Sequence, residues 1–218
     1  MNDILNRRRV QTVGEEIANA ISHGLGMIAA MLVTPFLIIK AIPLGAGAIT
    51  GAAIFGASMI VLYASSAIYH SLPQCRAKKI FQVFDHAAIF LLIAGTYTPF
   101  TLSALQGAWG WTLFGIIWGL AIVGVVLKTI YTDGTSKLSI ALYLAMGWLA
   151  VFAVRPLYYS MSATGLFWIL AGGVLYTAGV AFFAFDHKKK FNHFIWHLFV
   201  LGGTASHVIA VIYAFGHK

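Results

Sequence analysis

Two histidines near the C-terminal end of the chain have the spacing of a metal-binding pair. His193 and His197 are four residues apart, so on a helix their imidazoles project from one face and can bind the same cation. His70 lies in a different apolar segment and can supply a third nitrogen. Three protein ligands with an open fourth position are typical of a catalytic zinc ion rather than a structural one. The spacing therefore predicts a three-His zinc site.

Other polar residues can support such an ion and a reaction at it. Asp85 can position the zinc-bound water or act as its general base, because zinc lowers the pKa of that water to about 7. Ser66 precedes His70 by one helical turn and can orient it or a ligand. Three further residues share one face of the first apolar segment and are candidates to hydrogen-bond the metal ligands. They are Glu16, Asn19 and His23.

The segments that must position these residues are too apolar for a water-soluble protein. Of the 218 residues, 60% are hydrophobic and 9% are charged, and the mean hydropathy is +0.86. A soluble domain normally carries about a quarter charged residues, so the composition excludes that class. The single cysteine, Cys75, excludes a disulfide framework and a cysteine-based zinc site. The net charge of +8 does not indicate a nucleic-acid partner, because the basic residues lie between apolar runs.

The apolar runs predict seven transmembrane helices in an all-α bundle. A run of about 20 apolar residues crosses the bilayer as a helix, and these runs lack the alternation of transmembrane β-strands. The stretch 86–127 is too long for one crossing and is divided by small and polar residues at 103–110. We expect a single domain over residues 1–218. The predicted spans are residues 17–39, 47–70, 82–104, 109–129, 138–157, 164–185 and 192–215.

The distribution of Lys and Arg predicts a cytoplasmic N-terminus, because basic residues are retained on the cytoplasmic side of a membrane. In that orientation three basic residues, Lys40, Arg155 and Lys218, lie outside and eleven lie inside. Residues 1–15 then form a cytoplasmic segment, and the C-terminus lies outside. The first apolar run is too long for a signal peptide, so we expect an uncleaved helix. The inner residues are Arg7, Arg8, Arg9, Arg76, Lys78, Lys79, Lys128, Lys137, Lys188, Lys189 and Lys190.

This layout brings the polar residues to one level of the bilayer. An ionisable side chain within a membrane costs about 2.5–3.5 kcal/mol, so those present need partners and usually mark a function. The start of each odd-numbered span and the end of each even-numbered span lie at the cytoplasmic edge, and all the candidate site residues occupy such positions. His207 lies ten residues beyond His197, about 15 Å further along the helix. We expect a core hydrogen bond or a proton path there.

In order and spacing, these residues resemble those of the hemolysin III proteins, the bacterial branch of the progestin and adipoQ receptor family. The resemblance covers nearly the whole chain. It implies a seven-helix protein of the bacterial inner membrane with zinc held by His70, His193 and His197, and with Asp85 in contact with the bound water. The matching segments are Glu16-x-x-Asn19-x-x-x-His23, Ser66-x-x-x-His70, Phe84-Asp85-His86, residues 92–100 (LIAGTYTPF), and His193-x-x-x-His197 followed by His207.

Three functions stay open at this point. The similarity to eukaryotic receptors and alkaline ceramidases implies zinc-dependent hydrolysis of an amide or ester bond, with a membrane lipid as substrate. The hemolysin name implies a pore-forming protein, which would need polar residues through the depth of the bilayer. A third interpretation is a non-catalytic sensor in membrane-lipid homeostasis, in which zinc clamps the helices together. Imidazole ligands also suit iron, nickel and copper.

Overall fold

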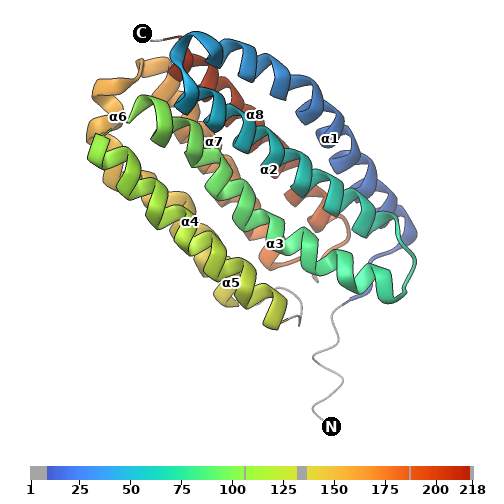
Figure 1. The fold of residues 1–218 in the computed structure, drawn as a ribbon. Coiled ribbons are helices and arrows are strands. Elements are labelled where there is room, and N and C mark those ends of the chain that lie inside the picture. The colour runs from blue at the N-terminus through green and yellow to red at the C-terminus, as the bar shows by residue number, and fades with distance from the viewer. Residues whose placement is uncertain (1–8, 106, 132–136, 187, 217–218) are drawn as a thin grey trace.

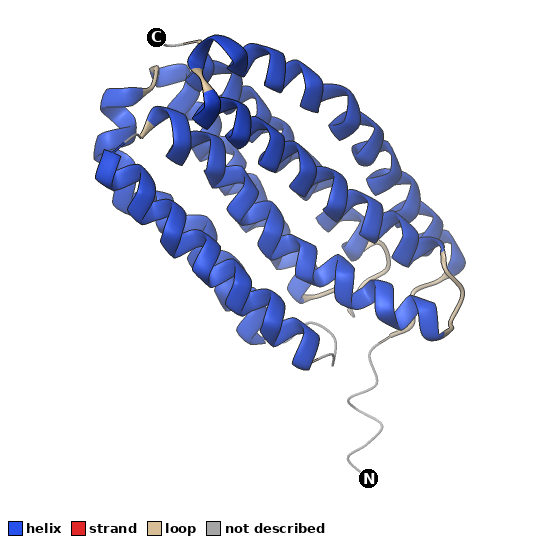
Figure 2. Ribbon diagram, in the orientation of Figure 1, coloured by secondary structure: helices blue, strands red, loops and turns tan. Residues whose placement is uncertain are grey.

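The described residues form seven long helical units that run side by side (Figures 1 and 2). The computed structural model describes residues 9–105, 107–131, 137–186 and 188–216. Within these ranges there is no β-strand, so the predicted all-α fold with seven spans is confirmed. The units that are long and apolar enough to cross a membrane are Val13–Leu44, Ala46–Ser71, Arg76–Ala104, Gly107–Ile130, Lys137–Ser160, Ala163–Ala184 and Asn192–Phe215.

Three of these units contain a short segment of another helical type. The α-helices are α1 (Val13–Ala41), α2 (Ala46–Ser71), α3 (Arg76–Pro99), α4 (Gly107–Ile130), α5 (Lys137–Trp148), α6 (Val154–Ser160), α7 (Ala163–Ala184) and α8 (Asn192–Phe215). The 3₁₀ segments η1 (Ile42–Leu44) and η3 (Leu149–Ala153) follow α1 and α5. A π-helical segment, η2 (Phe100–Ala104), follows α3.

Small residues bring the central helices close together. Helix α2 packs between α1 and α3, and α8 packs against α7 and α1. A methyl group on Gly56 of α2 would overlap Thr34 of α1, and one on Gly95 of α3 would overlap Ser58 of α2. Close approach through small residues is a general means of helix association in membranes. It brings α1, α2 and α3 into close contact in the half of the bundle away from the start of α1.

The third span begins at Arg76, six residues earlier than predicted. The prediction placed the basic residues of this region in a loop because a charge is costly within an apolar helix. In the structure, Lys78 lies in the first turn of α3 and its Nζ donates to the carbonyls of Tyr69 and Leu72, 3.0 Å from each. These acceptors at the end of α2 satisfy the ammonium, so the helix can include it.

The fifth span is broken, although the sequence predicts one continuous helix over residues 138–157. Pro156 lacks an amide hydrogen, and its ring clashes with the carbonyl four residues earlier in a regular helix. The chain responds with the 3₁₀ turn η3 between α5 and α6. The hydroxyl of Tyr97, from α3, donates to the carbonyl of Met146 and accepts from the amide of Ala150, at 2.9 Å in both cases. Tyr97 thereby satisfies backbone groups that the break sets free.

The orientation predicted from the loop charges can be tested at Cys75, which is exposed between α2 and α3. A membrane-impermeant maleimide should label Cys75 in inverted inner-membrane vesicles and not in spheroplasts. The matched control is Thr164→Cys in a Cys75→Ser background, because Thr164 is exposed at the opposite end of the bundle. This control should give the reverse pattern. Labelling of Cys75 in spheroplasts would contradict a cytoplasmic N-terminus.

Candidate metal centre

Three histidines from two helices converge at one end of the bundle. His70 lies in the last turn of α2, whereas His193 and His197 lie in the first two turns of α8. One nitrogen of each ring lies within 4.8 Å of a nitrogen of the other two, and all three side chains are buried. Within the described part of the chain, no other group of His, Cys, Asp and Glu side chains has the arrangement to hold a metal ion.

The ring of His70 is oriented by a carboxylate from α1. Its Nδ1 lies 2.7 Å from Oε2 of Glu16, whose other oxygen lies 2.9 Å from Nζ of Lys78. A hydrogen bond at the second ring nitrogen is the usual way in which a ligand histidine is held in one tautomer. The Nε2 atom of His70 is buried and has no hydrogen-bond partner among the residues described. A metal ion would satisfy this nitrogen.

The two histidines of α8 are held in the same way. Nδ1 of His197 lies 3.1 Å from the hydroxyl of Ser22, on α1. Nδ1 of His193 lies 3.3 Å from Oδ2 of Asp186, in the turn before α8. All three Nδ1 atoms therefore have oxygen partners, which leaves the three Nε2 atoms for an ion. The donor set and its partners fit a metal that prefers imidazole.

Sequence analysis did not identify Ser22 or Asp186 as part of this site. Ser22 follows Asn19 by three residues on α1, and that helical spacing was a signal that could have indicated it. Asp186 lies in a polar loop with three lysines nearby. That polar sequence predicts a solvated loop. The contact between Asp186 and His193 is visible only in the folded structure.

The other predicted residues of α1 lie against the histidines. Nδ2 of Asn19 is 3.5 Å from Nδ1 of His70, and it donates to Oε1 of Gln11 at 2.7 Å. The ring of His23 stacks on that of His197, with 3.6 Å between centroids and 4° between planes. Neither nitrogen of His23 has a hydrogen-bond partner within the described ranges. The structure thus places a fourth imidazole directly beside the three convergent ones.

Asp85 and Ser66 lie on the neighbouring side of the site. Asp85 is buried in α3, and its carboxylate is within electrostatic range of Ser66 and His193. Ser66 is buried in α2, but the described structure contains no hydrogen bond between it and His70. Ser66 therefore lies in the electrostatic environment of the Asp85 carboxylate, and it does not orient the ring of His70.

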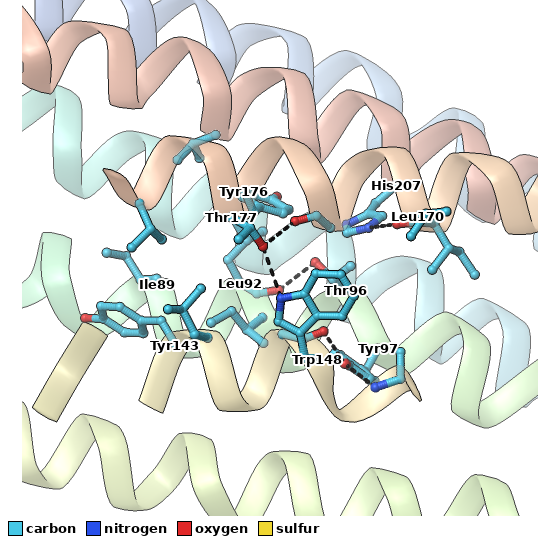
Figure 3. A pocket seen from close by; sticks show the side chains of 18 of the residues that line it. Ile89, Leu92, Thr96, Tyr97, Tyr143, Trp148, Leu170, Tyr176, Thr177 and His207 are labelled. Carbon is cyan, nitrogen blue, oxygen red and sulfur yellow. Dashed lines mark hydrogen bonds between the residues drawn. The ribbon is translucent and has the colours of Figure 1, made fainter. Parts of the chain in front are cut away.

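A largely apolar cavity of about 350 Å³ begins at this site. His23, Asp85, His193 and His197 line its polar end. Figure 3 shows the part between α3, α5 and α7, where aliphatic and aromatic side chains dominate. Trp148 of α5 crosses to α7 there, and its indole nitrogen donates to the hydroxyl of Thr177 at 3.1 Å.

A second polar cluster closes the bundle beside the histidines. The guanidinium of Arg9 donates to both carboxylate oxygens of Glu15, at 2.5 and 2.7 Å, and to the carbonyl of Lys189 at 3.3 Å. The hydrogen bond to Glu15 raises the pKa of Arg9. Glu15 also accepts from the amide of Phe191 at 2.8 Å. These contacts join the segment before α1 to the loop before α8, and so fix two of the histidines relative to α1.

Comparison with known proteins confirms the family resemblance that the sequence motifs indicated. The family described as Haemolysin-III related matches residues 11–208. Hemolysin-3 of Bacillus cereus is 46% identical over 207 residues, 94% of each chain, and the Hemolysin-3 homolog of Bacillus subtilis (strain 168) is 46% identical over 203 residues, 93% of this chain and 95% of the relative. Human monocyte to macrophage differentiation factor is 29% identical over 164 residues, 72% of this chain and 67% of the relative. The chain therefore belongs to the haemolysin-III family and is a multi-pass protein of the bacterial cell membrane.

Proposed function

We propose that this protein is a zinc-dependent hydrolase of an amide or ester bond in a membrane lipid. One observation carries the proposal: three buried histidines, each with an oxygen partner at its Nδ1, converge, and two of them, His193 and His197, line one end of a largely apolar cavity. A cavity with one polar end and an apolar wall suits an amphiphile better than a small polar metabolite.

His70, His193 and His197 are the residues that would hold the zinc ion. When bound, zinc supplies a Lewis acid that activates water and polarises a carbonyl group. Three imidazoles and an open position favour zinc among the metals that imidazole binds. Metal analysis of the purified protein would distinguish it from iron, nickel and copper.

Asp85 is the carboxylate placed to act on the water. It lines the cavity beside His193 and lies within electrostatic range of it. Asp85 accepts a proton from the attacking water as the water oxygen bonds to the acyl carbon. It returns that proton to the nitrogen or oxygen of the leaving group as the scissile bond breaks. A positioned general base of this kind contributes about 10²- to 10⁴-fold to a rate.

The second candidate is a structural metal ion that clamps the helices together. The contacts that the histidines make with other helices favour it. The histidines and their partners come from α1, α2, α8 and the turn before α8, so a bound ion would join segments distant in the sequence. A pore receives no comparable support, because the cavity wall is mainly apolar away from the histidines. Hydrolase and clamp differ in what Asp85 must do.

The first prediction from the proposed function concerns metal content. The combined His70→Ala, His193→Ala and His197→Ala variant should contain no zinc after purification, because it lacks every proposed ligand, whereas the wild type should contain a stoichiometric amount. Inductively coupled plasma mass spectrometry measures both. His86→Ala is the matched control, since its side chain packs against Phe183 outside the trio, and it should retain zinc. Undiminished zinc in the triple variant would remove the site.

The second prediction concerns the hydrogen bond from α1 to His197. Ser22→Ala should weaken zinc binding about 10- to 100-fold, the usual cost of losing the oxygen partner of a ligand histidine. Competition with a chromophoric chelator measures the affinity. Ser65→Ala is the control, because the Ser65 hydroxyl is also buried but donates to the carbonyl of Leu62 in its own helix. Equal affinities for the two variants would contradict the assigned role of Ser22.

The third prediction separates the hydrolase from the clamp. Asp85→Asn should keep its zinc and lose at least about 100-fold in turnover, because the amide cannot accept the proton. Release of free fatty acid from ceramides and phospholipids in nanodiscs measures turnover. Unchanged turnover would remove Asp85 from the mechanism. If zinc-loaded wild type releases no fatty acid from any of these lipids, the hydrolase proposal is wrong and the clamp is favoured.

A further inference from the structure

A second polar position lies deep in the cavity, on the α8 face that carries the metal-binding histidines. His207 is ten residues beyond His197 on the same helix, about 15 Å along its axis. Its Nε2 lies 3.1 Å from the carbonyl oxygen of Ile169 on α7. Because a carbonyl only accepts, Nε2 carries the proton and Nδ1 is a bare acceptor. This Nδ1 is buried and has no hydrogen-bond partner in the ranges that the structure describes.

The side chain of Tyr176, which carries a hydroxyl group, lies beside that of His207. The rings of Tyr176 and His207 have centroids 5.5 Å apart, and both residues line the cavity, as Figure 3 shows. The hydroxyl of Tyr63 donates to Oγ1 of Thr204 at 2.7 Å, and Oγ1 is also 2.7 Å from the hydroxyl of Tyr176. When the Thr204 hydroxyl donates its hydrogen bond to the oxygen of Tyr176, the Tyr176 hydroxyl is free to donate to a group in the cavity.

The fold leaves room for these two polar side chains. A methyl group on Gly172 would overlap the ring of His207, and one on Gly203 would press on the ring of Tyr176. The adjacent Gly173 has nothing within 4 Å of such a methyl group. The ring of His207 therefore occupies a place that depends on the absence of a side chain at residue 172.

We propose that Tyr176 and His207 form a second binding site in the cavity, for a hydroxyl group carried in the middle of a lipid acyl chain. A hydroxyl can accept from Tyr176 and donate to Nδ1 of His207 at once, whereas an ester or ketone oxygen cannot donate. The surrounding wall is apolar, which suits the chain on either side of the hydroxyl. This inference rests on the proposed function in one respect, that the cavity holds a lipid.

Binding of three fatty acids to the purified, zinc-containing protein tests the site. Ricinoleic acid carries a mid-chain hydroxyl, oleic acid carries none, and alpha-hydroxyoleic acid carries one beside the carboxylate. Displacement of radiolabelled oleic acid measures each affinity without any need for hydrolysis. Ricinoleic acid should bind about tenfold more tightly than oleic acid, the size of effect expected from hydrogen bonds to buried polar groups. Alpha-hydroxyoleic acid should bind with about the same affinity as oleic acid, because its hydroxyl lies too far from Tyr176 and His207.

Variants test whether these two side chains are responsible. Tyr176→Phe and His207→Phe should each abolish the preference for ricinoleic acid while they still bind oleic acid. Gly172→Ala should reduce the preference because it displaces His207, and Gly173→Ala is its matched control with the preference retained. Zinc content and gel filtration check that each variant is folded. Tyr176→Phe removes one oxygen atom and keeps the ring, so it tests the site even if the glycine variant does not fold.

The outcomes separate this site from the proposed function. Equal affinity of the wild type for ricinoleic and oleic acid would overturn the site and leave the lipid cavity standing, with water as the partner of His207. A preference that persists in both phenylalanine variants would also overturn it, because the hydroxyl would then bind elsewhere. Failure of all three acids to bind would remove the lipid cavity itself, and both proposals with it.

Discussion

The structure depends on the hydrogen bonding of imidazole rings that lie inside an apolar bundle. An unpaired polar group in such surroundings is costly, and α1 supplies much of the compensation. Glu16 and Ser22 bind the Nδ1 atoms of His70 and His197, which belong to other helices. The first helix contributes none of the three convergent histidines, yet it orients two of them. The polar face of α1 at this end therefore determines how the rings of His70 and His197 are oriented.

The sequence was sufficient for the number of spans and for the convergence of the histidines. Uncharged runs of the right length identify membrane helices, and the spacing of His193 and His197 needs only the geometry of one helix. Features that depend on contacts between helices could not be predicted. Pro156 is a signal of the break in the fifth span, but no pattern within residues 138–157 reports Tyr97 of α3 as the partner of the freed backbone groups. Asp186 was likewise hidden, because its role depends on how the loop before α8 folds back.

The cavity gives the candidate metal centre a context that the motif alone lacks. Three histidines can clamp helices or support a reaction with equal geometry. Here two of them, His193 and His197, line a largely apolar space together with Asp85, and His207 lines it further along α8. A purely structural ion has no need of such a space. The arrangement therefore favours a ligand that has a polar group at one end and a long apolar part that extends along α8.

The interruption between α5 and α6 lies in the part of the bundle that has the fewest contacts with other helices. Helices α1, α2 and α8 make extensive contacts in the bundle, and α2 and α8 carry the three convergent histidine rings. The wall formed by α5, η3 and α6 has fewer neighbours, and its halves are joined by a short 3₁₀ turn. The three convergent histidines thus belong to the extensively packed helices, whereas the irregular segment η3 lies on the opposite, more sparsely contacted wall of the same cavity.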